Sequence, residues 1–252
     1  VEEKVGNYMV FFPSYQFLSD VLEHLVDRFE SYEMGEVSSE LEGDLEKGEE
    51  VSNSSKGASL NKSEGVANAS KRTSYRRGYA SKLMKYVSED TEIIVQQRDM
   101  TEAKKQQFLK EFESNDSGSK GITRIGMCVI GGVFSEGIDL TGDRLIGVII
   151  VGTGLPMVCT ENEIYKDYFD KKKNQGFQYA YTYPGMNKVT QAGGRLIRTS
   201  TDTGFILLLD SRFLNREYDN LFPQEWLPYT IVNKGNVGKA VKEFWDGIEG
   251  DE

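Results

Sequence analysis

Five short apolar runs, separated by segments with helical periodicity, constrain the fold of this chain more than any other feature. The runs are continuous rather than alternating, which is typical of strands buried on both faces of a parallel sheet. We therefore predict an α/β fold with a parallel sheet flanked by helices on both faces. The predicted strands cover residues 7–12, 92–97, 122–131, 144–151 and 204–209, and the predicted helices cover residues 15–29, 101–112, 161–171, 185–199 and 237–245.

Residues 33–70 interrupt this alternation. Ser, Glu, Gly, Asn and Lys dominate the segment, and it contains no aromatic residue. A segment this polar cannot bury enough apolar surface to offset the conformational entropy lost on ordering. We therefore expect a disordered, low-complexity insertion inside one domain that spans residues 1–252.

A basic stretch follows the insertion. No acidic residue occurs from residue 66 to residue 88. The pattern has two interpretations, a solvated helix that returns the chain to the sheet or a local contact with nucleic acid. The cations are Lys71, Arg72, Arg76, Arg77, Lys82 and Lys85.

Composition argues against several classes of protein. The net charge of −10 speaks against bulk coating of nucleic acid, because neutralising phosphates requires clustered Lys and Arg. Cys128 and Cys159 are the two cysteines and His24 is the one histidine, so no disulfide framework, metal site or histidine-based triad is predicted. The chain has no apolar run long enough to cross a bilayer and no signal-like N-terminus, so we expect no membrane contact and a cytoplasmic location.

The sequence Gln-Ala-Gly-Gly-Arg-Leu-Ile-Arg at residues 191–198 is the strongest candidate for a functional site. On a helix with about 100° per residue, Gln191, Arg195 and Arg198 share one narrow face and Leu196 lies on the opposite one. Guanidinium and amide groups in such a stripe suit a polyphosphate. The alternative is a solvated helix face with two ordinary surface arginines.

Glycines and carboxylates follow the predicted strand at residues 122–131, where an open parallel sheet exposes its ligand-binding edge. Glu136, Gly137 and Asp139 lie in this loop. The alternative interpretation is a plain turn in which Ser135 and Asp139 cap local backbone groups.

Two other predicted strands end in residues able to contact phosphate. Ser14 and Tyr15 follow the first strand, where Ser14 is either a helix N-cap or part of an anion contact. Arg98 follows the second strand and is either a surface ion-pair partner or a phosphate contact.

The chain lacks the loop that normally holds nucleotide phosphates. The pattern Gly-x-x-x-x-Gly-Lys-[Ser/Thr] does not occur, and no predicted strand ends in an Asp-Glu pair that could hold magnesium. The sequence therefore offers arginines and an acidic loop for a nucleotide without the cradle for its phosphates, which is what half of a shared site looks like.

Three segments, in this order, resemble motifs IV, V and VI of superfamily 2 helicases, most closely the DinG and XPD family. The resemblance runs from Gly6 to about Trp226 without the insertion, and it implies the C-terminal, second RecA-like motor domain of the P-loop NTPase type. The segments are Phe11-Phe-Pro-Ser-Tyr15, Gly131-Gly-Val-Phe-Ser-Glu-Gly-Ile-Asp139 and Gln191-Ala-Gly-Gly-Arg-Leu-Ile-Arg198, followed by Asp202-x-Gly204 and Leu209-Asp-Ser-Arg-Phe213.

The resemblance assigns the residues of the third segment to ATP. Arg198 matches the arginine finger that reaches the γ-phosphate of ATP, bound with Mg²⁺ on the other motor domain. Arg195 matches its companion arginine, and Gln191 would position the attacking water or these arginines. Guanidinium groups suit this role because phosphoryl transfer spreads negative charge over oxygens and arginine stays protonated.

The other two segments are implied to link the nucleotide to DNA. Glu136, Gly137 and Asp139 match motif V, which couples the nucleotide to the DNA strand, and Ser14 and Tyr15 match motif IV, whose neighbourhood contacts the DNA backbone. The Walker A loop, the DEAH box and the cysteines of the family's iron–sulfur cluster have no counterpart in this chain. The chain alone is therefore expected to be inactive, with no iron–sulfur cluster of its own.

Two functions follow as hypotheses. The first is the C-terminal motor domain of an ATP-dependent DNA helicase, acting on single-stranded DNA together with the N-terminal motor domain of the same protein, with 5′ to 3′ polarity implied by the resemblance. The second is a stand-alone nucleic-acid-binding or regulatory RecA-like module without ATPase activity. A preceding Walker A loop and DEAH box would support the first.

Overall fold

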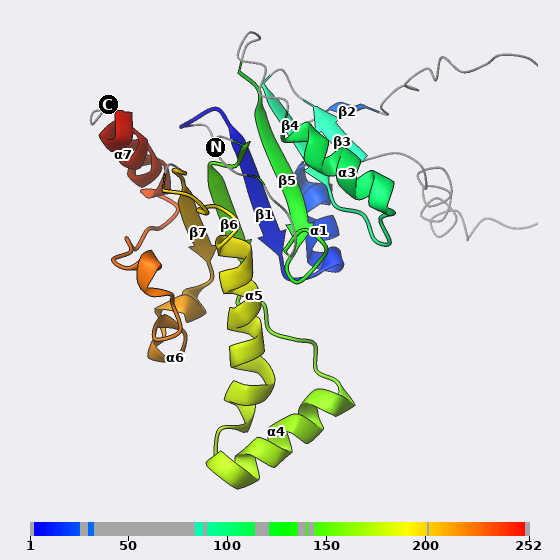
Figure 1. Ribbon diagram of the computed structural model, residues 1–252, viewed down its shortest axis with the longest axis vertical. Helices are drawn as coiled ribbons and strands as arrows, with labels where there is room; N and C mark the ends of the chain where they lie inside the picture. The colour runs from blue at the N-terminus through cyan, green and yellow to red at the C-terminus, as the bar shows by residue number, and fades with distance from the viewer. Residues whose placement is uncertain are drawn as a thin grey trace, which may run out of the picture. The chain divides into compact units, whose positions relative to one another are not determined.

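In the described part of the chain, seven strands form one sheet in the order β2-β3-β4-β5-β1-β6-β7 (Figure 1). The computed structural model describes residues 3–25, 30–32, 84–87, 90–113, 121–135, 140, 144–200 and 202–249. The strands are β1 (Asn7–Phe12), β2 (Glu30–Tyr32), β3 (Met84–Val87), β4 (Thr91–Val95), β5 (Thr123–Val129), β6 (Gly147–Val151) and β7 (Phe205–Leu209). The longer helices are α1 (Tyr15–Leu25), α3 (Glu102–Glu111), α4 (Thr160–Lys173), α5 (Tyr183–Gly193) and α7 (Val237–Glu249). The shorter ones are α6 (Arg216–Asp219), the π-helix η3 (Gln178–Thr182) and the 3-10 helices η4 (Ser211–Leu214) and η5 (Gln224–Trp226).

Five neighbouring strands, β4, β5, β1, β6 and β7, run parallel. The first strand of the chain lies at the centre of this group, with Met9 opposite Gly126 of β5 and Val148 of β6. Strands β2 and β3 extend the sheet in antiparallel orientation beyond β4. The predicted parallel α/β fold is confirmed.

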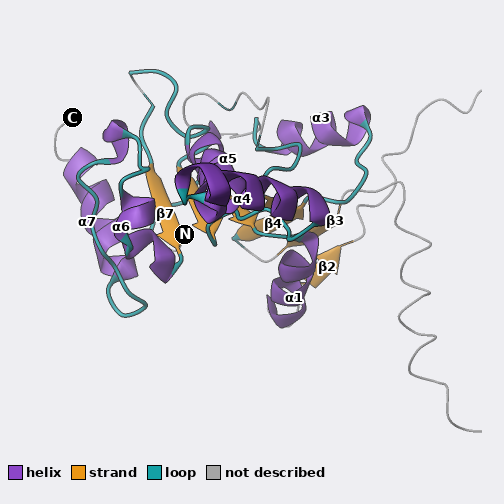
Figure 2. Ribbon diagram, turned by 90° about the horizontal axis from the view of Figure 1, so that it is seen from below, coloured by secondary structure: helices purple, strands orange, loops and turns teal. Residues whose placement is uncertain are grey.

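Helices cover both faces of the sheet, and Figure 2 shows α3 and α5 on one side of the strands and α1 on the other. On the first face Met9 and Phe11 of β1 pack with residues of α3 and α5, and Cys128 of β5 is fully buried among them. On the second face Leu18 and Leu22 of α1 pack against β1, β4 and β5, and α7 covers a smaller cluster around Tyr8. Both faces are apolar, which explains why the strands appear in the sequence as continuous apolar runs.

All five predicted strands are present, with ends shifted by a few residues. Thr101 is the N-cap of α3, since its Oγ1 accepts a hydrogen bond from Lys104 N. Strands β2 and β3 were not predicted. Lys85 lies in β3, so the predicted solvated helix is wrong for Met84–Val87. The remaining basic residues before it, and the predicted insertion at 33–70, lie outside the described residues.

The helix predicted to end at residue 199 ends earlier, at Gly193. A Cβ at Gly193 would lie 2.4 Å from the Trp226 ring, and the next N–H groups bond three residues back, from Arg195 N to Ala192 O and from Leu196 N to Gly193 O. Two successive glycines are poor helix formers, and the tightened last turn ends α5. The predicted helical face is therefore wrong, because Arg195 and Arg198 lie beyond the end of α5. Leu196 is buried.

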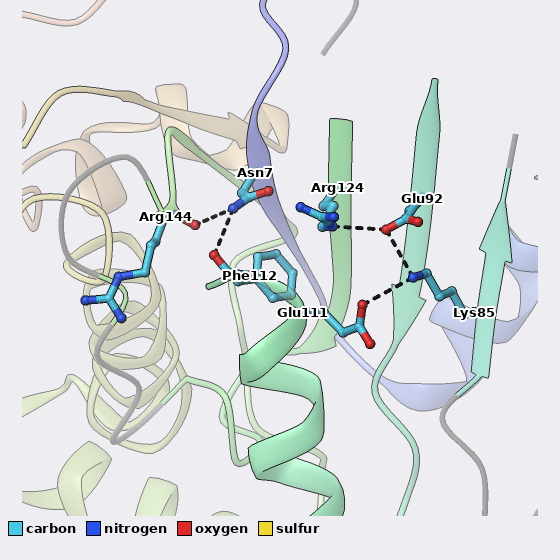
Figure 3. A network of polar contacts seen from close by, with 7 residues as sticks. All are labelled: Asn7, Lys85, Glu92, Glu111, Phe112, Arg124 and Arg144. Carbon is cyan, nitrogen blue, oxygen red and sulfur yellow. Dashed lines mark hydrogen bonds and ion pairs between the residues drawn. The ribbon is translucent and has the colours of Figure 1, made fainter. Parts of the chain in front are cut away.

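A half-buried cluster of charges joins α3 to the antiparallel edge of the sheet (Figure 3). The Glu92 carboxylate of β4 contacts Arg124 Nε of β5 at 3.0 Å and Lys85 Nζ of β3 at 3.1 Å. Lys85 also contacts Glu111 of α3 at 3.2 Å. The side chains of Glu92, Lys85 and Arg124 are only 12%, 11% and 14% exposed, so these pairs are shielded from water.

The buried amide of Asn7 ties two loops to the start of β1 (Figure 3). Its Nδ2 donates to Phe112 O at 3.2 Å and to Arg144 O at 3.0 Å. The end of α3 and the approach to β6 are thereby held beside the central strand.

Within the described residues, no helix has the length and apolar character needed to cross a bilayer.

The substitution Glu92→Leu is expected to lower the free energy of unfolding by about 3 kcal/mol, because it leaves two poorly hydrated cations without the carboxylate they share. Urea unfolding measures the change. The matched control is Glu102→Leu, which removes the partner of Lys105 at the exposed start of α3 and should change the free energy of unfolding much less, because water screens this pair. Equal losses in the two variants would contradict a structural role for the cluster.

Candidate functional site

The candidate site lies where the parallel strands end. In Figure 1 the arrowheads of β1, β5, β6 and β7 point to the same edge of the sheet, from which α4 and α5 extend. Strands β4, β5 and β1 are neighbours, so the residues that follow them meet at this edge although they come from distant parts of the sequence. In open α/β sheets this is the edge at which ligands bind.

Ser14 caps the helix that follows β1. Its Oγ accepts a hydrogen bond from Phe17 N at 3.1 Å, and its carbonyl accepts one from Leu18 N at 3.0 Å. The N-cap interpretation of Ser14 is therefore confirmed. A contact between Ser14 and nucleic acid stays a prediction.

Tyr15 and Arg98, predicted separately from two strand ends, lie together. The Arg98 guanidinium lies 5.0 Å from the centre of the Tyr15 ring, within the range of a cation–π contact. The Tyr15 hydroxyl accepts a hydrogen bond from Gln96 Nε2 at 2.8 Å. Burial raises the pKa of the Tyr15 phenol, so the hydroxyl stays protonated at neutral pH. Arg98 is exposed, and the following Asp99 adopts a left-handed backbone conformation with φ of 53° that turns the chain.

The loop after β5 is folded tightly against the end of its own strand. Gly131 has φ of 70°, which favours glycine, and its N–H donates to Ser135 Oγ at 2.8 Å. The buried Ser135 hydroxyl in turn donates to Val129 O at 3.4 Å. Phe134 stacks on Phe108 of α3 with ring centres 4.1 Å apart.

The predicted capping role of Ser135 is thus confirmed. The other predicted residues of this loop, Glu136, Gly137 and Asp139, lie outside the described residues, and their roles stay predictions.

Arg195 joins the segment after α5 to the loop after β5. Its Nε donates to Ser135 O at 3.0 Å across 60 residues of sequence, and its side chain is half-buried. Gln191 lies in the last turn of α5 and is exposed. The structure thus brings Arg195 to the β5 loop, whereas Gln191 makes no direct contact with those predicted site residues that the structure describes.

Arg198 lies in a turn that Asp202 organises. The Asp202 carboxylate accepts hydrogen bonds from Arg198 N at 2.8 Å, Thr199 N at 2.9 Å and Thr199 Oγ1 at 2.7 Å. The Arg198 residue is exposed. Asp202 was noted in the sequence without a role, and its position four residues after the arginine is the signal that could have indicated this capping function.

Glycines bring α5 close to the edge of the sheet. A Cβ at Gly185 would lie 2.6 Å from Thr153 O, and a Cβ at Gly154 would lie 2.9 Å from Gly185 O. Since both contacts involve backbone atoms, only glycines permit this approach of α5 to the loop after β6. It holds the first turn of α5 against the loop after β6.

Sequence reasoning missed Gln96, which is 2% exposed. Besides the bond to Tyr15, its Oε1 accepts a hydrogen bond from Val129 N at 2.9 Å. The only indication of this role in the sequence is that Gln96 is a polar residue directly after an apolar run. Among the described residues, no group of three or more His, Cys, Asp or Glu side chains could hold a metal ion.

Comparison with known proteins places this geometry in a family. The sequence pattern of the helicase C-terminal domain matches residues 59–229, and Ser14 and Tyr15 precede this range. ATP-dependent DNA helicase DinG of Photobacterium profundum is 33% identical over 126 residues, covering 49% of this chain and 18% of that protein. A regulator of telomere elongation helicase 1 homolog of Caenorhabditis elegans is 32% identical over 125 residues, covering 46% of this chain and 12% of that protein.

More distant similarities extend further along the chain. ATP-dependent DNA helicase chl1 of Schizosaccharomyces pombe is 28% identical over 160 residues, covering 60% of this chain and 18% of that protein. The solved structure XPD_APO has a TM-score of 0.49 at 17% identity and covers 86% of this chain and 30% of that one. The chain thus spans less than a fifth of the length of these three sequence relatives.

The predicted resemblance to the DinG and XPD family, with its RecA-like fold, is confirmed. The matched range contains the loop after β5 together with Arg195 and Arg198. Since it includes more than half of the 252 residues, the chain belongs to the helicase C-terminal domain family.

Proposed function

We propose that this chain is the second motor domain of an ATP-dependent DNA helicase and completes an ATP site whose phosphate cradle lies on an N-terminal motor domain. The observation that carries the proposal is the hydrogen bond from Arg195 to Ser135 O, which joins the arginine-bearing segment to the β5 loop at the ligand edge of the sheet. Family membership supports it.

The described residues fit the terminal phosphates of a nucleotide. Arg198 is exposed on a turn fixed by Asp202, so its guanidinium can reach across an interface while its backbone stays ordered. Bound ATP, with Mg²⁺, would supply the phosphoryl group that is transferred to water. Arg198 and Arg195 would stabilise the negative charge that develops on the phosphate oxygens, and Gln191 would orient the attacking water.

The other end of the site fits a nucleic-acid strand. Arg98 presents an exposed cation on the ring of Tyr15, and Ser14 lies at the N-terminus of α1, where backbone dipoles favour an anion. We infer that single-stranded DNA crosses this end and that the loop with Glu136, Gly137 and Asp139 links it to the nucleotide. The protein would act in the cytoplasm.

The test uses the full-length protein that carries this domain. Its ATPase activity should be stimulated by single-stranded DNA, and Arg198→Ala should lower kcat by about 10³-fold, the usual contribution of an arginine finger, while ATP binding changes little. Steady-state kinetics and ATP titration measure the two effects.

The control is Lys239→Ala, which removes an exposed cation on α7 that pairs with Glu243. It should leave both quantities unchanged. Unchanged turnover in Arg198→Ala would exclude the finger role. A wild-type protein that binds DNA without hydrolysing ATP would instead favour the nucleic-acid-binding or regulatory module.

Asp202→Ala should loosen the turn that carries Arg198, because it removes three hydrogen bonds to Arg198 and Thr199. Each bond contributes about 1 kcal/mol, so cleavage by trypsin after Arg198 should become roughly tenfold faster or more. Mass spectrometry of the early fragments identifies this cut. Asp202→Asn keeps one acceptor oxygen and should be intermediate, and wild-type cleavage rates in Asp202→Ala would show that the carboxylate does not hold the turn.

A further inference from the structure

We propose that Gln96 is a positioning residue that couples the DNA end of the site to its nucleotide end, an inference that rests on the proposed function. Gln96 lies directly after β4, between the residues assigned to DNA and the loop that contacts Arg195. It belongs to none of the three helicase-like segments of the sequence.

The orientation of the Gln96 amide is dictated by its surroundings. Val129 N can only donate, so the amide oxygen must face it, at 2.9 Å. The amide nitrogen then faces the Tyr15 hydroxyl at 2.8 Å and makes that hydroxyl an acceptor. With 2% of its surface exposed, Gln96 has no water to replace either partner. The amide therefore fixes the start of α1 relative to the end of β5.

On the DNA side, the Tyr15 ring links the hydrogen bonds of Gln96 to Arg98. The Arg98 guanidinium lies 5.0 Å above the centre of that ring, so the position of the ring determines where the cation is held. A phosphate that draws Arg98 toward itself would also pull on Tyr15, whose hydroxyl is bonded to Gln96.

On the nucleotide side, the backbone of Val129 links Gln96 to the loop that contacts Arg195. Its N–H bonds to Gln96, and its carbonyl accepts hydrogen bonds from Gly132 N at 2.9 Å and from Ser135 Oγ at 3.4 Å. Ser135 O in turn accepts the bond from Arg195 Nε at 3.0 Å. A cation–π contact and four hydrogen bonds, joined through the residues Tyr15, Gln96, Val129 and Ser135, thus connect Arg98 to Arg195.

Close packing makes this path stiff at its centre. A Cβ at Gly132 would lie 2.8 Å from Gln96 Nε2, so the β5 loop rests directly on the amide. In a close-packed interior a displaced group moves its neighbours, since no void absorbs the change. A shift of Tyr15 on DNA binding would therefore move the β5 loop and the carbonyl that holds Arg195.

The test compares single-stranded DNA stimulation of ATPase activity, the ratio of kcat with saturating DNA to kcat without it, in full-length variants. Gln96→Leu keeps the approximate size and removes both hydrogen bonds, and we expect the ratio to fall about tenfold, within the usual range of coupling between two sites. The DNA concentration that gives half-maximal stimulation should change much less than the ratio.

Three further variants separate coupling from simple loss of structure. Gln96→Glu keeps an oxygen for Val129 N and can accept a bond from the Tyr15 hydroxyl, so it should retain most of the stimulation. Tyr15→Phe removes the hydroxyl but keeps the ring for Arg98, and should reproduce the loss. Gln97→Leu is the matched control, because Gln97 contacts Lys104 of α3 instead and should retain the wild-type ratio.

The double variant Tyr15→Phe with Gln96→Leu should lose no more stimulation than Gln96→Leu alone, because both changes break the same path. Full stimulation in a folded Gln96→Leu variant, or independent losses in the double variant, would overturn the coupling and leave the proposed function intact. A wild-type protein without DNA-stimulated ATPase activity would overturn the proposed function, and the coupling with it.

Discussion

The parallel pairing of β1 between β5 and β6 is the constraint on which the rest of the structure depends. Parallel strands all end at the same edge, so the segments after β1, β4 and β5 are brought together there, although they are far apart in the sequence. Both faces of these strands are buried by helices, so the strand ends are the part of the sheet that the loops leave for a ligand. The position of the candidate site is therefore determined by the order and direction of the strands, and the individual side chains determine only its chemistry.

Glycine determines how the arginines are presented. Gly185 lets α5 approach the loop after β6, and Gly193 lets the end of α5 pack on Trp226. Because the helix stops there, Arg195 and Arg198 stand on an irregular segment whose shape is set by contacts with the β5 loop and with Asp202. A continuous helix would have fixed the two arginines relative to each other, whereas this segment ties each of them to a different neighbour.

The elements that depend on local chemistry could be predicted from the sequence, and those that depend on distant partners could not. The parallel strands and the cap by Thr101 follow from apolar runs and a side chain next to its own helix. Lys85 suggests a solvated segment until Glu92 and Glu111 are placed beside it by the sheet. The early end of α5 depends on Trp226, and the role of Gln96 depends on Val129 and Tyr15, none of which is close in sequence.

The two cysteines occupy very different environments, so the rates at which their thiols are alkylated report on the opening of the sheet. Cys128 is fully buried in β5, and burial raises the pKa of its thiol, so it is unreactive toward alkylating reagents while the sheet is closed. Cys159 is partly exposed just before α4. Alkylation of Cys159 would therefore require no opening of the sheet, whereas alkylation of Cys128 would measure how often the strand that precedes the β5 loop opens to solvent.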